Sequence, residues 1–177
     1  MRMNFISYLK QYIIVLLLLC LIWLQTNAQQ PAPCYEPIAG FGTAAYAVAS
    51  GGWCFNCNSF PDISRVTDAD KNNFATATAP LGLQANQGIT VVDSNTTYPA
   101  GYHAGFVVET GNDLITGSIL QHFTLQTFND GLLQESKDKA NGLAVSILSG
   151  SAGKMFLNFK TTAPFDEVRF IVSETIN

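Results

Sequence analysis

From Ile38 onward the apolar residues of this chain recur with a period of two far more clearly than with the helical period of 3.6, and this pattern favours a fold built from short β-strands. The clearest example is residues 122–127 (HFTLQT), where polar and apolar side chains alternate. Residues 129–131 (Asn-Asp-Gly) follow, and they supply the positive-φ residues that a tight hairpin turn requires. The sequence therefore predicts a β-hairpin whose second strand covers residues 132–136.

Later segments show the same alternation and indicate how the strands pack. Strands with one apolar face can bury it only when one sheet packs on another, so we expect an antiparallel β-sandwich. Residues 114–120 (LITGSIL) could be helical, but they are few and include Gly117, so a single turn or a loop is expected. The alternating positions are Leu143, Val145 and Ile147, then Met155, Leu157 and Phe159 after a turn at residues 149–153, and finally Phe165, Val168, Phe170 and Val172 after Pro164.

Residues 1–28 have the composition of an export signal that is cleaved from the mature protein. Arg2 and Lys10 give a positive start, residues 12–24 form an apolar run, and Ala28 is a small residue at the expected cleavage point. A membrane-spanning helix needs about 20 apolar residues, so we expect cleavage and no membrane span. The mature protein is therefore expected to be secreted or to act at the cell surface.

The rest of the chain is expected to form one domain. Residues 29–37 (QQPAPCYEP) are proline-rich and predict an extended leader, and residues 38–177 are long enough for a single sandwich. The chain stops at Asn177 after a strand-like run, which suggests a truncated product or a last strand supplied by following sequence.

The chain is acidic overall, with 9 Lys and Arg residues against 13 Asp and Glu residues. Because phosphate binding needs clustered Lys and Arg, we expect no nucleic-acid partner.

Cys54 and Cys57 form a C-x-x-C pair with two interpretations. A redox-active pair should open a helix, whose N-terminus lowers the pKa of one thiol. Residues 58–62 (NSFPD) instead predict a loop, so a structural disulfide in an oxidising compartment is favoured. Cys34 is then free or replaces one partner of the bridge. Zinc is disfavoured, because the sequence has no second C-x-x-C and its two histidines are distant.

Asp68, Asp70 and Asn72 form a D-x-D-x-N pattern of oxygen ligands, the kind that calcium prefers. The spacing excludes an EF-hand, because Asn73 stands at the glycine position and Ala79 at the closing carboxylate position. The pattern is typical of either a structural calcium site or an Asx-rich turn whose side chains cap their own backbone.

Trp53, Tyr98 and Tyr102 are candidate ligand-binding residues, because aromatic rings stack on the apolar faces of sugars. The alternative is that these rings pack in the core or close loops. Catalysis is not expected, since no G-x-S-x-G motif accompanies His103 or His122 and no pair of carboxylates has a spacing that sets a catalytic separation.

Four segments, taken in order, resemble an adhesin-like module of large secreted surface proteins of Gram-negative bacteria. The resemblance covers residues 54–172, and it implies a binding or adhesion domain without catalytic residues. The segments are residues 52–80 (GWCFNCNSFPDISRVTDADKNNFATATAP), 98–109 (YPAGYHAGFVVE), 125–136 (LQTFNDGLLQES) and 164–170 (PFDEVRF).

A looser resemblance links residues 66–76 (VTDADKNNFAT) to the galactose-binding-like jelly rolls of discoidin and many carbohydrate-binding modules. In that family an Asp and neighbouring carbonyl oxygens hold a structural calcium. Here Ala69 replaces the usual Gly, and Phe74 stands near the usual Trp.

These features predict a secreted, non-catalytic β-sandwich of jelly-roll type. Its expected partner is a surface glycan or polysaccharide, or another surface protein, and carbohydrate is the preferred ligand class. The expected contact region consists of the loops at residues 51–62, 68–73 and 93–103. The alternatives are an architectural spacer module of a surface protein and an exported thiol oxidoreductase that uses Cys54 and Cys57.

Overall fold

The computed structural model divides the chain into two compact units, Met1–Tyr35 and Glu36–Asn177. The described helices and strands belong to the second unit. Of residues 54–55, 81–82, 85 and 117 the backbone alone is described. The structure describes residues 35–51, 54–55, 60–76, 81–82, 85–109, 117–148 and 153–173.

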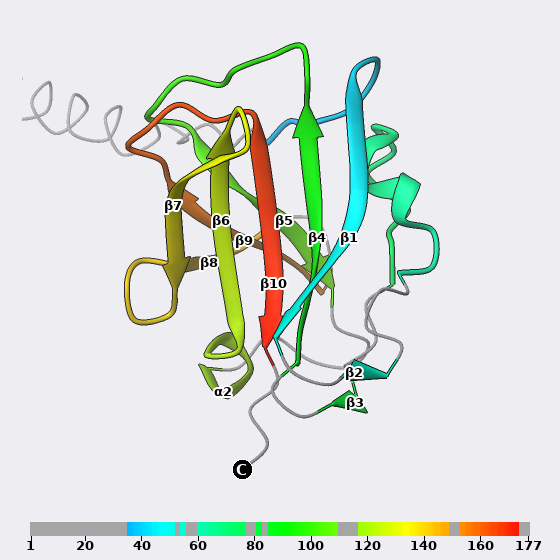
Figure 1. The fold of residues 1–177 in the computed structure, drawn as a ribbon, viewed down its shortest axis with the longest axis vertical. Coiled ribbons are helices and arrows are strands. Elements are labelled where there is room, and N and C mark those ends of the chain that lie inside the picture. The colour runs from blue at the N-terminus through cyan, green and yellow to red at the C-terminus, as the bar shows by residue number, and fades with distance from the viewer. Residues whose placement is uncertain are drawn as a thin grey trace, which may run out of the picture. The chain divides into compact units, whose positions relative to one another are not determined.

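The second unit is built from two antiparallel sheets that lie one behind the other (Figure 1). The larger sheet has five strands in the order β1 (Thr43–Gly51), β4 (Ala85–Asp93), β10 (Glu167–Ser173), β6 (Phe123–Asn129) and β7 (Leu132–Asp138). The smaller sheet has three strands in the order β5 (His103–Glu109), β9 (Lys154–Lys160) and β8 (Ala144–Ile147). The expectation of an all-β, antiparallel fold is confirmed.

Short elements occupy the connections. The strands β2 (Cys54–Phe55) and β3 (Leu81–Gly82) pair with each other, and the 3-10 helix η1 (Ile63–Thr67) follows β2 along the chain. The α-helix α2 (Gly117–Leu120) is a single turn, as expected for the described part of residues 114–120. The helical segments that the structure describes are too short or too polar to span a bilayer.

The predicted hairpin is confirmed as β6 and β7. Asn129 pairs with Leu132, and the two residues between them have positive φ, 50° at Asp130 and 73° at Gly131. Positive φ at both central positions defines a type I′ turn, which the Asp-Gly pair favours. The register shifts between Thr127 and Phe128, and this irregularity was not predicted.

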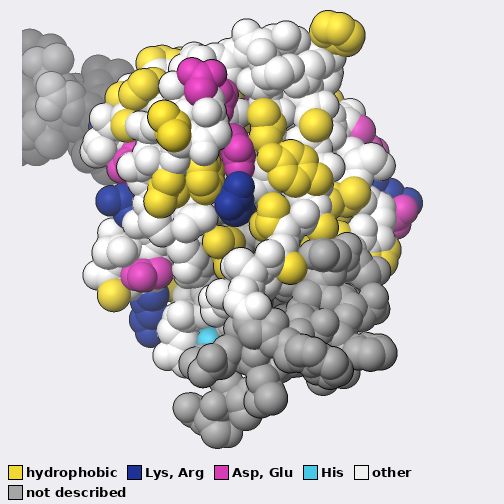
Figure 2. Space-filling model, in the orientation of Figure 1, with side chains coloured by type: hydrophobic (Ala, Val, Ile, Leu, Met, Phe, Trp, Pro, Cys, Tyr) yellow, Lys and Arg dark blue, Asp and Glu magenta, His cyan; other side chains and the backbone are white. Residues whose placement is uncertain are grey.

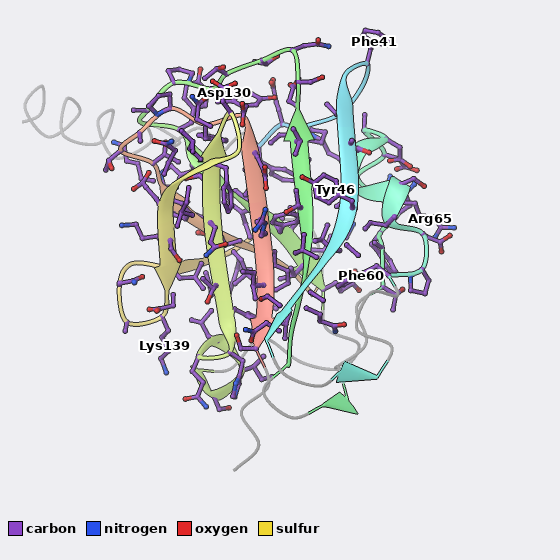
Figure 3. All side chains as sticks on the ribbon, in the orientation of Figure 1. Phe41, Tyr46, Phe60, Arg65, Asp130 and Lys139 are labelled. Carbon is purple, nitrogen blue, oxygen red and sulfur yellow. The ribbon has the colours of Figure 1, made fainter. Side chains whose placement is uncertain are left out.

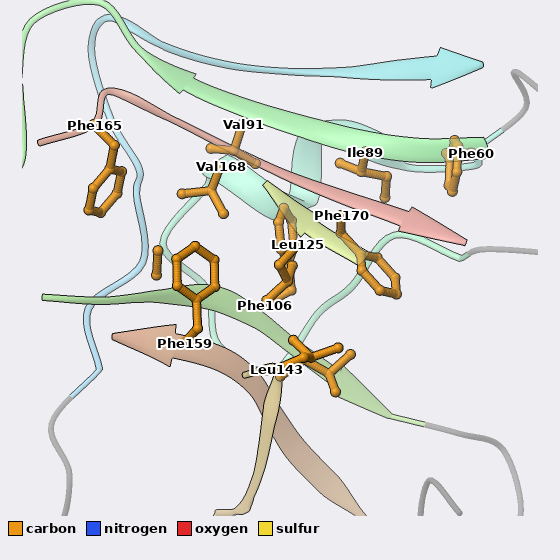
Figure 4. Close-up of a cluster of buried hydrophobic side chains, with 12 residues drawn as sticks. Phe60, Ile89, Val91, Phe106, Leu125, Leu143, Phe159, Phe165, Val168 and Phe170 are labelled. Atoms are coloured by element: carbon orange, nitrogen blue, oxygen red, sulfur yellow. The ribbon is translucent and has the colours of Figure 1, made fainter. Parts of the chain in front are cut away.

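The core lies between the two sheets, as the alternation requires (Figure 4). Leu125 of the larger sheet and Leu157 of the smaller sheet are fully buried. The rings of Phe106 on β5 and Phe170 on β10 lie 5.8 Å apart and join the layers. The buried members of the core cluster are Phe60, Ile89, Val91, Ala104, Phe106, Leu125, Leu143, Leu157, Phe159, Phe165, Val168 and Phe170.

Ile147 is the exception among the predicted core positions, because its side chain is 67% exposed. It pairs with the buried Met155 and lies on the core side of the sheet, but it ends β8, which is an edge strand. The position therefore has the predicted orientation but stays exposed at the end of an edge strand.

The edge strand β7 carries charged side chains on its core side. Lys137 pairs with Leu125 and Glu135 pairs with Thr127, and directly opposite residues point to the same face of a sheet. The Glu135 carboxylate accepts hydrogen bonds from the backbone N and hydroxyl of Thr162, at 2.8 and 3.0 Å. It thereby ties β7 to the segment that precedes β10.

Candidate functional site

Tyr98, one of the predicted ligand-binding residues, is engaged within the fold. Its ring stacks on Phe165 with the centroids 5.3 Å apart, and the backbones of the two residues form a β-bridge. Its hydroxyl donates a hydrogen bond to Asp93 Oδ2 at 2.9 Å. Burial, the hydrogen bond to Asp93 and the charge of that carboxylate together raise the pKa of Tyr98 to about 12, and burial is the largest cause.

Asp93 is the last residue of β4, and its carboxylate holds the Tyr98 hydroxyl in place. Burial raises the pKa of Asp93, but hydrogen bonds from the backbone N of Asn95, from Tyr98 and from Thr96 outweigh burial and hold the pKa below its ordinary value. The Asp93–Tyr98 pair thus closes the start of the loop between β4 and β5.

The other predicted aromatic residues differ in their placement. Tyr102 precedes β5 and its side chain is 57% exposed, so it is available to a ligand. Trp53 lies outside the described residues.

The predicted disulfide also lies outside the described residues, because they include neither Cys57 nor Cys34.

Asp68, Asp70 and Asn72 lie in one exposed turn after η1. Asp68 Oδ1 accepts a hydrogen bond from the backbone N of Asp70 at 3.0 Å, and Asp70 Oδ1 accepts one from the backbone N of Asn72 at 2.9 Å. These are the bonds of an Asx-rich turn, one of the two interpretations of this motif. Asp68 Oδ2 also accepts a hydrogen bond from Asn73 Nδ2 at 2.8 Å.

Oxygen atoms of the same turn have acceptor positions left for a cation. Asn73 Oδ1 is buried and has no hydrogen-bond partner among the described residues. A carboxylate offers about four acceptor positions, so the two hydrogen bonds that Asp68 accepts do not saturate it. Within the described ranges, however, no group of three or more His, Cys, Asp and Glu side chains is placed to hold a metal ion. Calcium at this turn stays a prediction.

A second candidate site lies on the outward face of the five-stranded sheet, away from the core. The strand registers place five side chains from five strands in one line across this face, because directly paired residues share a face. We call this line the cross-strand row. Its members, in order, are Tyr46 on β1, Thr90 on β4, Arg169 on β10, Gln126 on β6 and Ser136 on β7.

Arg169 is the centre of the cross-strand row and is held on three sides. Its Nε donates a hydrogen bond to Thr90 Oγ1 at 2.8 Å, and its Nη2 pairs with Glu167 Oε1 at 2.8 Å. Its guanidinium carbon lies 4.2 Å from the centroid of the Phe128 ring. Such stacking and directed bonding fix the plane of a guanidinium. The Arg169 side chain is still 26% exposed, so a ligand can reach it.

Tyr46 presents an aromatic ring at one end of the row. Its side chain lies on β1, the first strand of the sheet order, and it is 44% exposed (Figure 3). Burial raises the pKa of Tyr46, the charge of Glu167 raises it further, and that of Arg169 opposes the shift. The phenol therefore lies within electrostatic range of the ion pair.

The surroundings of the row are largely uncharged. Figure 2 shows this face, with apolar side chains on both sides of a basic and an acidic group. The register row next to it holds Ala44, Val92, Glu167, Phe128 and Leu133, and the row on its other side holds Val48, Gly88, Ile171, Thr124 and Asp138.

A third feature is Phe41, which stands at the tip of a turn before β1 with its side chain 97% exposed (Figure 3). The turn is braced, because Asn95 Nδ2 donates to the Phe41 carbonyl at 2.8 Å and Ser94 donates to the Gly42 carbonyl through both its backbone N and its hydroxyl. Gly42 has φ 89°, a conformation that favours glycine. The turn therefore holds an apolar ring in solvent.

The cross-strand row was not predicted from the sequence, although part of its signal was present there. In β10 the alternation puts Glu167 and Arg169 on the face opposite Val168 and Phe170, so an outward ion pair could have been found. Placing Tyr46 beside that pair requires the order β1-β4-β10, which no local pattern contains.

Comparisons with known proteins give no further guide. No family model, no curated protein and no solved structure matches this chain.

Proposed function

We propose that this chain is an exported, non-catalytic binding module that works in the extracellular space or at the cell surface, and that carbohydrate is its preferred ligand class. We also propose that its fold is of the jelly-roll type. Eight described strands in two sheets support that assignment, as do connections that pass from one sheet to the other between β4 and β5 and between β9 and β10.

The cross-strand row is the observation that carries the functional proposal. A sugar offers hydroxyl groups, which need hydrogen-bond partners, and apolar ring faces, which stack on aromatic side chains. The row offers both kinds of contact on one exposed surface: a half-exposed ring at Tyr46 and polar groups at Arg169, Gln126 and Ser136. The expected export and the resemblance to adhesin-like modules agree with such a role.

The test is affinity electrophoresis of the mature protein in native gels that contain a soluble polysaccharide. A carbohydrate-binding module is expected to migrate more slowly in at least one of these gels than in a gel without polysaccharide. Unrelated proteins of similar charge serve as controls for sieving. Equal mobility in every gel would contradict the proposal.

A second candidate function, an architectural spacer that contacts another surface protein, is favoured by the braced Phe41. A large apolar ring that a braced turn holds in solvent is available to enter a pocket of another protein, as the aromatic anchor residues of protein interfaces do. A spacer would show unchanged mobility in all polysaccharide gels, so the same experiment separates the two functions.

A further inference from the structure

We propose that the ligand is an uncharged glycan chain that lies across the strands of the five-stranded sheet, along the cross-strand row, with one sugar ring stacked on Tyr46 and hydroxyl groups bound by Arg169, Gln126 and Ser136. This inference rests on the proposed function and specifies its site and its ligand.

The length of the row favours a chain over a single sugar. The row crosses five strands, which makes four steps between neighbours, and each step measures about 4.8 Å, so its ends lie roughly 19 Å apart. The polar members are distributed along this line, with Arg169 at its middle and Ser136 at the far end from Tyr46. A ligand that contacts both ends must therefore be extended.

The charges on this face favour an uncharged ligand. Arg169 is compensated by Glu167, and the Glu167 side chain is almost completely buried beneath it. Among the described residues at outward positions of this sheet, Asp138 in the outermost strand carries the other charge. An acidic sugar would have to compete with Glu167 for the guanidinium, whereas a hydroxyl can accept from an N–H group of Arg169 while the ion pair stays intact.

The rigidity of the row favours recognition of a defined chain. The Arg169 guanidinium is fixed by Thr90, Glu167 and Phe128 before any ligand arrives. Gln126 Nε2 lies 3.4 Å from Ser136 Oγ and donates to it, which holds the second half of the row together. Groups that are already in place lose little conformational entropy on binding.

The experiment compares variants in native gels with neutral probes (hydroxyethyl cellulose, galactomannan and dextran) and with one acidic probe (polygalacturonate). Tyr46→Ala is expected to weaken retardation by a retained neutral probe about ten-fold, since a stacked ring contributes on that order. Tyr46→Phe keeps the ring and should retain binding. Gln126→Ala should weaken binding about three-fold. Phe74→Ala, which removes an exposed ring outside the row, is the matched control.

Each outcome decides a different part of the inference. Loss of binding in Tyr102→Ala with full binding in Tyr46→Ala would overturn the site and leave the proposed function intact. Stronger retardation by polygalacturonate than by every neutral probe, abolished by added salt, would overturn the ligand class. If no probe retards the wild-type protein, the proposed function fails and the inference fails with it. Circular dichroism and thermal melting of each variant show that the fold is retained.

Discussion

Arg169 connects three neighbours on the outward face, and Glu167 depends on it most. The Glu167 side chain is almost completely buried, and its Oε1 accepts hydrogen bonds from Arg169 and from Thr90. A buried carboxylate that loses its cationic partner must stay charged in an unfavourable environment or take up a proton. The stability of this face should therefore depend on the pair as a unit.

We expect Arg169→Met to lower the free energy of unfolding by about 2 to 3 kcal/mol, because it leaves Glu167 buried without its cationic partner. The double variant Glu167→Gln with Arg169→Met should lose less than the sum of the two single variants. Chemical denaturation measures all three, and Lys160→Met, which removes an exposed cation, is the control. A loss in Arg169→Met no larger than that in Lys160→Met would show that the ion pair does not stabilise the fold.

The Asp93–Tyr98 pair makes stability depend on pH at both extremes. The folded-state pKa of Asp93 lies below the ordinary 3.8, so its contribution is present above that value and is lost as the pH falls through the folded-state pKa. The pKa of Tyr98 is raised from 10.0 to about 12, so its contribution is present below pH 10 and is lost as the pH rises towards 12.

Tyr98→Phe should abolish the loss of stability at alkaline pH that comes from ionisation of the Tyr98 hydroxyl. The variant should also have a lower melting temperature at neutral pH, because Asp93 loses one hydrogen-bond donor. Melting temperatures across the pH range, taken as the difference between the wild-type protein and the variant, measure both effects. An identical pH profile for the two proteins would mean that the hydrogen bond contributes nothing.

At the scale of single elements, the sequence pattern predicted the features that depend on residues close together in the chain. The β6–β7 hairpin depends on residues that are adjacent in the chain, since the Asp130-Gly131 pair alone selects its turn. The shift between Thr127 and Phe128 was not predictable in this way, because alternation gives the faces of a strand but not the place at which its register with a neighbour changes. The position of β10 between β4 and β6 joins residues far apart in the chain, and alternation gives the faces of a strand but not its neighbours.

The turn at Asp68 allows a test at this scale. Asp68→Ala removes two hydrogen bonds, so we expect it to lower the free energy of unfolding by about 1 kcal/mol in the presence of a chelator. The calcium prediction requires in addition that millimolar calcium raises the melting temperature of the wild-type protein and raises that of Asp70→Asn less. Equal transitions with calcium and with chelator would remove the metal site and leave the Asx-rich turn.

At the scale of the whole second unit, the two sheets share one core. Leu125 and Leu157 come from different sheets and belong to the same buried cluster. Neither sheet can bury its apolar face without the other, so the two should unfold together.

We expect Leu125→Ala and Leu157→Ala each to lower the free energy of unfolding by about 3 kcal/mol, because each leaves a cavity in the shared core. Calorimetry should show a single transition that moves to lower temperature in both variants. Ile147→Ala, at a position that is exposed on the same sheet, is the control and should change little. Two separate transitions in either variant would show that the sheets are independent.

The charged edge strand β7 also affects how the protein behaves at high concentration. Unpaired edges invite another strand to add, and charged side chains that point toward the core side of an edge are a known defence. A strand that added to β7 from a neighbouring copy would have to desolvate Lys137, whose side chain is 31% exposed and lies 3.8 Å from Glu135 Oε1. The sheet is therefore protected on this side against growth into fibres, even when many molecules are packed side by side.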